Sequence, residues 1–382
     1  MSQPPLSLYI HFPWCIRKCP YCDFNSHKAG DDAPRGRYVD ALLSDLDFEG
    51  TRAAGRQVGT IFLGGGTPSL FTADEISAVL NSVDSNLTVS PDCEITLEAN
   101  PGTIEHGSLA AYRQAGVTRL SLGAQSFSAS QLQVLGRIHS PDDVRRAYEE
   151  ACAAEFDSIN IDLMFALPGQ DLAGARKDVA SLLELAPPHI SYYQLTLEPN
   201  TVFYKRPPPG IPDDGLAWTI QEQCHEMFRD AGYLQYEISA FSREGHQCLH
   251  NLNYWKFGDY LAVGAGAHGK LTDAEGSPWR YQKPAHPLTY IETIDQGDYV
   301  DAAIRVNKED SVFEFMLNAL RLSDGFSEQE FTARTGLQME AIDALLLTAQ
   351  QDGLIEHCAA GQWRPTGTGF RFLNDLQARF LP

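Results

Sequence analysis

Three cysteines, Cys15, Cys19 and Cys22, lie on one short segment near the start of the chain, with three and then two residues between them. A single loop that carries three thiolates can wrap one face of an iron–sulfur cube. A 4Fe-4S cluster ligated by three sulfurs keeps one iron open to an external ligand, as catalytic metal sites do. The spacing therefore predicts a 4Fe-4S cluster with one reactive corner.

The alternative metal is zinc, with His11 or His27 as a fourth ligand. Structural zinc sites usually pair two short knuckles that are far apart in sequence, and this chain has no second knuckle. Three unpaired core cysteines are a weaker explanation, because crowding thiols on one loop serves no packing need. The other five cysteines are scattered and are expected to be small core or surface residues.

The first half of the chain alternates β-rich runs with helical stretches. Strands are expected at 6–12, 60–63, 94–98, 119–123, 159–165 and 190–197, and helices at 35–51, 73–83, 108–115, 130–154 and 172–185. Six strands joined by five crossovers imply a parallel sheet.

An open doubly wound sheet and a barrel share this alternation. The polar and glycine-rich segments decide between them, because they fall at the carboxyl ends of strands: the cysteine loop, 64–68, 98–101, 123–126 and 198–200. Functional loops that converge on one rim are typical of a barrel. We therefore predict an α/β fold, an open, partial (β/α)6 TIM-like barrel.

Three domains are expected: the partial barrel at 1–205, a connecting region at 206–305 and a mostly α, winged-helix-like module at 306–382. The last module shows three helical patterns followed by a small hairpin. Winged helices often bind DNA. Residues 310–382 hold ten acidic residues against five arginines and no lysine, so we interpret this module as a packing unit.

The 382 residues include 29 basic and 50 acidic ones, a formal charge of -21. Such a chain repels phosphate backbones and anionic lipid, so nucleic acid is not expected as a partner. A membrane span is not expected either, because no window approaches eighteen consecutive apolar residues. The N-terminus has no signal-peptide pattern, and a cytoplasmic location is expected.

The Cys-x3-Cys-x2-Cys loop, with Tyr21 just before the last cysteine, resembles the radical S-adenosylmethionine (radical SAM) superfamily. Four further segments, Gly64–Pro68, Glu98–Pro101, Gly123–Phe127 and Asn160–Pro168, resemble the group that holds oxygen-independent coproporphyrinogen III oxidase and related heme chaperones. The resemblance covers nearly the whole chain and implies a radical SAM barrel with the C-terminal module of that group.

The resemblance also implies roles for single residues. Gly65, Gly66 and Thr67 would receive the methionine end of S-adenosylmethionine at the open iron, and Glu98 would accept hydrogen bonds from its ribose or amino group. Other cofactor contacts are implied for Tyr9, Tyr21, Gln125, Arg137 and Asp162, some of them to a second S-adenosylmethionine molecule in the oxidase. Electron transfer from the cluster would then allow radical chemistry that belongs to the cofactor.

Two departures favour the chaperones over the oxidase. Phe24 stands where the oxidase group has a further cysteine, and the oxidase's N-terminal extension is not expected before Cys15. In addition, residues 250–255 match the His-Asn-x-x-Tyr-Trp motif associated with the chaperones. An imidazole can ligate heme iron, and adjacent aromatics offer flat apolar surface to a porphyrin.

We therefore predict a heme chaperone that binds a 4Fe-4S cluster, S-adenosylmethionine and heme, with His250 as the heme ligand and Cys248 or His246 as rivals. Acceptor hemoproteins, such as respiratory enzymes or an iron storage protein, would receive the heme. One alternative is a coproporphyrinogen III dehydrogenase, and a second is a radical enzyme on another substrate. His250 could instead be a buried, hydrogen-bonded histidine, and His268 lies in a glycine-rich turn that could approach a cofactor or simply be tight.

Overall fold

A computed structural model describes residues 3–30, 32–102 and 108–382. Its centre is a twelve-stranded sheet in the order β14-β13-β12-β11-β1-β4-β5-β6-β7-β8-β10-β9. The six predicted strands lie side by side in chain order and pair in parallel. They are β1 (Leu6–Phe12), β4 (Gln57–Gly65), β5 (Thr88–Ala99), β6 (Arg119–Gln125), β7 (Ser158–Phe165) and β8 (His189–Gln194). The predicted α/β fold with a six-strand parallel unit is confirmed.

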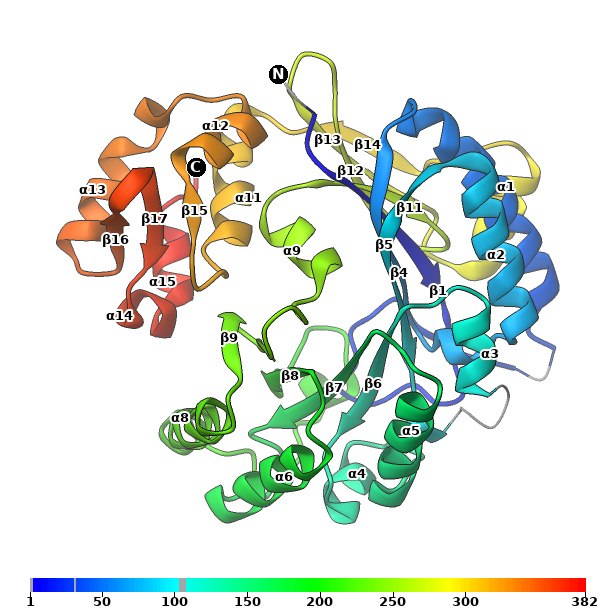
Figure 1. Cartoon of the computed structure of the whole chain (residues 1–382), viewed down its shortest axis with the longest axis horizontal. Coiled ribbons are helices and arrows are strands. Elements are labelled where there is room, and N and C mark those ends of the chain that lie inside the picture. The colour runs from blue at the N-terminus through cyan, green and yellow to red at the C-terminus, as the bar shows by residue number, and fades with distance from the viewer. Residues whose placement is uncertain (1–2, 31, 103–107) are drawn as a thin grey trace.

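The crossover helices lie on the outer side of this sheet, as Figure 1 shows. They are α1 (Arg35–Ala53), α2 (Ala73–Asn86), α3 (Leu109–Gln114), α4 (Ala129–Val134), α5 (Pro141–Ala153) and α6 (Leu172–Leu185). The single helix predicted at 130–154 was wrong, because the chain forms α4 and α5 there. Gly136 takes a left-handed φ of 71°, and Ser140 caps a new helix that has Pro141 in its first turn.

The connecting region extends both edges of the sheet with strands that the sequence did not predict. On one edge β11 (Asp259–Val263) pairs in parallel with β1, and β12 (His268–Thr272), β13 (Pro278–Gln282) and β14 (Ala302–Arg305) follow in antiparallel order. On the other edge β10 (Ala240–Ser242) and β9 (Leu234–Glu237) pair antiparallel after β8. Helix α7 (Val202–Lys205) leads into the connecting region, whose helices include α8 (Asp214–Asp230) and α10 (Pro287–Asp295).

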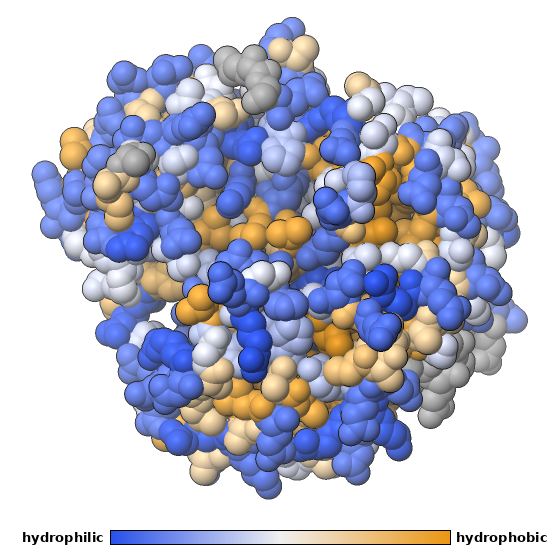
Figure 2. All heavy atoms as spheres, in the orientation of Figure 1, coloured by the Kyte–Doolittle hydropathy of each residue, from blue (hydrophilic) through white to orange (hydrophobic). Residues whose placement is uncertain are grey.

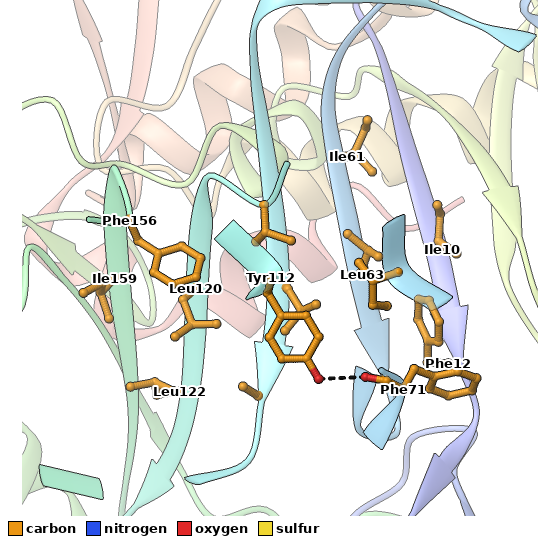
Figure 3. Close-up of a cluster of buried hydrophobic side chains, with 14 of the residues drawn as sticks. Ile10, Phe12, Ile61, Leu63, Phe71, Tyr112, Leu120, Leu122, Phe156 and Ile159 are labelled. Atoms are coloured by element: carbon orange, nitrogen blue, oxygen red, sulfur yellow. Dashed lines mark hydrogen bonds between the residues drawn. The ribbon is translucent and has the colours of Figure 1, made fainter. Parts of the chain in front are cut away.

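Alternation along the strands separates an apolar outer face from a polar inner face. Figure 3 shows part of the outer cluster, in which strand residues such as Leu63 and Leu122 pack under Tyr112 of α3. The Tyr112 hydroxyl donates to the carbonyl of Phe71 at 2.7 Å. Inward positions on the same strands include Asn160, whose amide donates to Ser121 Oγ at 2.8 Å. The inner face can therefore hold polar ligands.

A buried ion cluster fixes the extended edge of the sheet to α1. Lys283, just after β13, donates to Asp45 Oδ1 at 2.5 Å and to Glu49 Oε1 at 2.8 Å, and all three side chains are fully buried. Asp45 Oδ2 also accepts from the backbone N–H of Gly264 at 3.2 Å and from the Tyr290 hydroxyl at 2.8 Å. Burial raises the pKa of Asp45 to about 6. These contacts hold the glycine-rich turn after β11 in place.

The C-terminal module packs around an apolar core that also includes Phe257 of the connecting region, and its division into a separate domain stays a prediction. It contains α11 (Lys308–Ala319), α12 (Glu328–Thr335), α13 (Asp343–Gln351), α14 (Gly367–Arg371), α15 (Leu373–Ala378) and a small sheet of β15 (Phe326–Ser327), β17 (Gln362–Pro365) and β16 (Ile355–Cys358). Figure 2 shows that the outer surface on this face is mostly hydrophilic, with apolar side chains visible in the furrows. Within the described residues, no helix has the length and apolar character that crossing a bilayer requires.

Candidate functional site

The cysteine segment forms a closed loop at the carboxyl end of β1. Its base is a short parallel pair, β2 (Trp14–Cys15) with β3 (His27–Lys28). The Lys18 ammonium donates to the carbonyl of Ser26 at 2.9 Å and fastens the loop across its width. Cys15, Cys19 and Cys22 are free thiols of intermediate exposure. The structure therefore brings the three predicted ligands onto one ordered loop.

The electrostatics around this loop suit thiolate ligands that neutralise a metal cluster. Burial raises the pKa values of the Cys15 and Cys22 thiols, so neither is a stable thiolate without a positive partner. Arg137 supplies one fixed positive charge, with Nη1 at 3.7 Å from Cys19 Sγ and Nη2 donating to the carbonyl of Gly123 at 2.7 Å. The iron ions of a bound cluster would supply the remaining positive charge that stabilises the thiolates.

The zinc alternative requires donors that converge on a single ion. Among the described residues, no group of three or more His, Cys, Asp or Glu side chains is arranged to hold one metal ion. His11 is already engaged at both ring nitrogens, because Nδ1 lies 3.0 Å from the Tyr9 hydroxyl and Nε2 lies 2.8 Å from the Asn25 carbonyl. His27 Nε2 lies 3.2 Å from Asn25 Oδ1. In an iron–sulfur cube each cysteine binds its own iron, so this donor set fits the cube better.

The glycine segment after β4 packs tightly against the base of the cysteine loop. Gly65 has a φ of 111°, and a Cβ there would lie 2.3 Å from the His11 ring. A Cβ on Gly66 would lie 2.7 Å from the Trp14 carbonyl oxygen. Only glycine fits such approaches. Burial raises the pKa of Cys15, and a hydrogen bond from Thr67 offsets part of that rise, so the predicted methionine-binding residues adjoin the cysteine loop.

Two half-buried carboxylates, Glu98 at the end of β5 and Asp162 in β7, share the inner face. Burial and then the charge of Asp162 raise the pKa of Glu98 to about 7. Burial also raises the pKa of Asp162, although Asn160 donates to it at 2.7 Å. Glu98 Oε2 accepts from the Gly65 N–H at 3.0 Å. S-adenosylmethionine carries a sulfonium and an ammonium charge, and a cationic ligand would relieve this repulsion.

The remaining predicted cofactor residues divide between two surroundings. Tyr9 lines a large cavity with Glu98 and Gly65. Tyr21 packs instead in an apolar cluster that includes Phe203. Gln125 takes a left-handed φ of 69° and accepts from the Tyr193 hydroxyl at 2.6 Å. The expectation that Tyr9 and Tyr21 flank one adenosyl group stays a prediction.

The large cavity has a volume of about 630 Å³ and extends from the predicted cofactor residues to the connecting region. Beyond Glu98 it is lined by aromatic and cationic side chains, and Asn318 of α11 contributes to the lining. Clefts of ~300–1,000 Å³ with apolar walls and a few polar groups are the usual binding sites for small ligands. The residues of this wall are Tyr254, Trp255, Phe257, Tyr260, His268, Lys270 and Arg280.

The His-Asn-x-x-Tyr-Trp motif forms α9 (Leu249–Trp255), which lies on the inner side of the sheet (Figure 1). His250 is buried, with Nδ1 at 2.9 Å from Thr60 Oγ1 and Nε2 at 3.0 Å from the Tyr254 hydroxyl. Burial lowers the pKa of His250 to about 3. Ligation of heme by His250, which stays a prediction, would require one of these hydrogen bonds to break. Of the rivals, Cys248 is fully buried beside Glu94.

Asn25 joins the cysteine loop to the turn between β11 and β12, and sequence reasoning missed it. Its Nδ2 donates to the carbonyls of Ala265 at 3.0 Å and Ala285 at 2.8 Å. A Cβ on Gly266 would lie 2.2 Å from this nitrogen, so the turn fits around the amide. The turn leads into His268, the first residue of β12. A lone asparagine in a loop carries no spacing signal that could have identified it.

Comparison with known proteins places these features in a family. Residues 9–182 match the radical SAM superfamily, and residues 306–372 match the HemN C-terminal domain. The heme chaperone HemW of Escherichia coli (strain K12) is 48% identical over 381 residues, which cover 100% of this chain and 99% of that protein. The mouse mitochondrial radical S-adenosyl methionine domain-containing protein 1 is 39% identical and covers 87% of this chain and 78% of its own.

Among solved structures, coproporphyrinogen III oxidase (HemN) from Escherichia coli superposes with a TM-score of 0.82 at 21% identity, covering 99% of this chain and 90% of that one. At this identity the likeness shows a shared fold. The full-length similarity to HemW proteins is much closer in sequence and spans the cysteine loop, the sheet and the C-terminal module. The chain belongs to the HemW heme chaperone family of the radical SAM superfamily.

Proposed function

We propose that this protein is a heme chaperone, which binds heme and passes it to acceptor hemoproteins. The observation that carries the proposal is the 630 Å³ cavity, because it joins Gly65 and Glu98 to the aromatic side of α9 in a chain that resembles HemW over its full length. Tyr254 and Trp255 offer flat apolar surface to a porphyrin. The acidic charge of the rest of the chain leaves nucleic acid outside the proposal.

The radical SAM family brings a 4Fe-4S cluster and S-adenosylmethionine. In the proposal Cys15, Cys19 and Cys22 ligate the cluster, and Gly65, Gly66 and Thr67 bind the methionine end of the cofactor. Glu98 and Asp162 attract its positive charges, while Arg137 balances the thiolates beside Cys19. When bound, the cluster and cofactor supply one-electron chemistry, which a chaperone can use without converting the heme.

A cytoplasmic site of action and the three domains at 1–205, 206–305 and 306–382 belong to the same proposal. Strands of 206–305 lie in the same sheet as those of 1–205, so these two parts would act as one body. Asn318 of α11, which contributes to the cavity lining, would give the C-terminal module a share in holding the ligand.

Anaerobic reconstitution tests the proposal. The protein should take up iron and sulfide in a 4Fe-4S ratio, bind hemin with a saturable change in absorption, and lose that hemin to an added apo-hemoprotein. Apomyoglobin serves as the acceptor probe, and the same hemin concentration without the protein is the control. Absence of saturable hemin binding would contradict the proposal.

A coproporphyrinogen III dehydrogenase is the second candidate, favoured by the HemN-like fold alone. The assay supplies reductant, S-adenosylmethionine and coproporphyrinogen without oxygen. We expect no porphyrinogen product at an enzymatic rate, because Phe24 replaces the further cysteine of the oxidase group and opens onto the cavity instead. Formation of harderoporphyrinogen or protoporphyrinogen with turnover would establish the enzyme instead.

A further inference from the structure

The cavity contains an imidazole that the proposed function has not used. His268 begins β12, is exposed, and lines the same cavity as Tyr9 and Glu98. Within the described part of the chain its ring makes no hydrogen bond. Partial burial and the charge of Arg280 lower the pKa of His268, which keeps the imidazole in the neutral form that binds metals.

The other candidate ligands are engaged or enclosed. His11 lines the same cavity, but both of its ring nitrogens have partners. His250 is 1% exposed and supports Tyr254 through its Nε2. Cys248 is 0% exposed, and burial raises the pKa of its thiol to about 11. Of these candidates, only His268 lines the cavity with ring nitrogens that have no hydrogen-bond partner among the described residues.

The walls next to His268 suit the rest of a heme. The rings of Tyr254 and Tyr260 lie 4.6 Å apart, nearly perpendicular, and Trp255 continues the aromatic surface. Arg280 lines the same cavity and donates to Glu314 Oε2 at 3.0 Å from Nε and 2.7 Å from Nη2. Its Nη1 also donates to the Tyr260 hydroxyl, and since the planar group has five N–H donors, it can still donate to a carboxylate in the cavity.

We propose that His268 is the iron ligand for heme in this cavity and that Arg280 binds a heme propionate. This inference rests on the proposed function and makes it specific: the ligand lies on the extended edge of the sheet rather than in α9. The cofactor residues Gly65 and Glu98 then border the same space as the heme, while α9 provides an aromatic wall.

Hemin titration of the reconstituted protein, followed by difference absorption and electron paramagnetic resonance, tests the ligand. His268→Ala should weaken hemin binding by on the order of tenfold or more and remove the signature of histidine ligation. His268→Cys should replace it with the signature of a thiolate, which a merely structural role would not produce. His286→Ala, at an exposed histidine outside the cavity lining, is the matched control and should behave as the unaltered protein.

Each other outcome is decisive. If His268→Ala and His268→Cys keep the original spectrum, the proposal is wrong. If His250→Ala alone removes it, the ligand is His250, and the chaperone function still stands. A weakened His268→Ala without a thiolate signature in His268→Cys assigns His268 a structural role and also overturns the proposal. Failure of the unaltered protein to bind hemin contradicts the proposed function itself.

The propionate contact is tested with hemin and its dimethyl ester. Esterification removes the carboxylate charges, so it should weaken binding to the unaltered protein by about tenfold, as loss of a charge-assisted hydrogen bond does. It should have little effect on Arg280→Gln, which already lacks the cation. An equal loss in both proteins would remove Arg280 from the site.

Discussion

Glu98 should make the affinity for S-adenosylmethionine depend on pH near neutrality. Burial and the nearby charge of Asp162 raise the pKa of Glu98 to about 7, far above that of an exposed glutamate. A raised pKa means that the group is protonated and neutral below pH 7 and becomes a carboxylate above it. Only the carboxylate can attract the positive charges of the cofactor, so affinity should rise with pH.

The size of the effect follows from the ionised fraction. A group with a pKa of about 7 is roughly one-tenth ionised at pH 6 and nine-tenths ionised at pH 8, so affinity should change about tenfold between these values. His11 cannot produce this change, because burial lowers its pKa to about 4. Tyr9 cannot either, since burial raises its pKa well above 10.

Anaerobic calorimetry of S-adenosylmethionine binding to cluster-loaded protein at pH 6, 7 and 8 measures the effect. Glu98→Gln should bind more weakly and with a flat pH profile. Asp162→Asn should move the fall in affinity to lower pH, because it removes a charge that raises the pKa of Glu98. A flat profile in the unaltered protein, or the same slope in Glu98→Gln, would refute the role of this carboxylate.

Three further changes test the loop, the glycine segment and the ion cluster. Cys19→Ser should lose the 4Fe-4S iron and sulfide on reconstitution, whereas Cys93→Ser should keep them, and equal contents would contradict the ligand assignment. Gly65→Ala should lower S-adenosylmethionine affinity at least about tenfold by calorimetry, because its Cβ would meet a ring at 2.3 Å, whereas at Gly59 the nearest atom is 3.9 Å away and alanine should be tolerated. Lys283→Met should destabilise the protein by about 3–5 kcal/mol in urea unfolding, since two buried carboxylates lose their cation, and a loss under about 1 kcal/mol would show that they are not charged.

The parallel half of the fold could be predicted because its signals are local. Each of the six strands is a short apolar run that ends in polar or glycine residues, and α2, α3, α5 and α6 begin at side-chain caps. The start of β5 was missed, because Pro91 argues against a strand. In the structure Pro91 lies in an irregular part of β5, where the register between β4 and β5 shifts. Val58 pairs with Val89, but Thr60, two residues later, pairs with Glu94.

The outer strands could not be predicted, because they depend on pairing between distant segments. β10 has three residues and β9 four, too few to show alternation. β12 contains Lys270, and a lysine predicts an exposed position. In the structure its side chain is buried, and Lys270 Nζ lies 2.9 Å from Asp259 Oδ1 in an ion pair. The part of the cavity wall that β11, β12 and β13 form was therefore not predicted, although the cysteine loop was located from its spacing and the glycine segment from its place at the end of a strand.

The amide of Asn25 has a consequence for anyone who exchanges parts between related chains. It joins two segments 240 residues apart, and any side chain at position 266 would clash with this amide. The cysteine loop and the distant turn therefore depend on each other for their fit. A chimera that takes the loop from one relative and the turn from another would bring together residues that do not fit at this contact, even if every helix and strand matched.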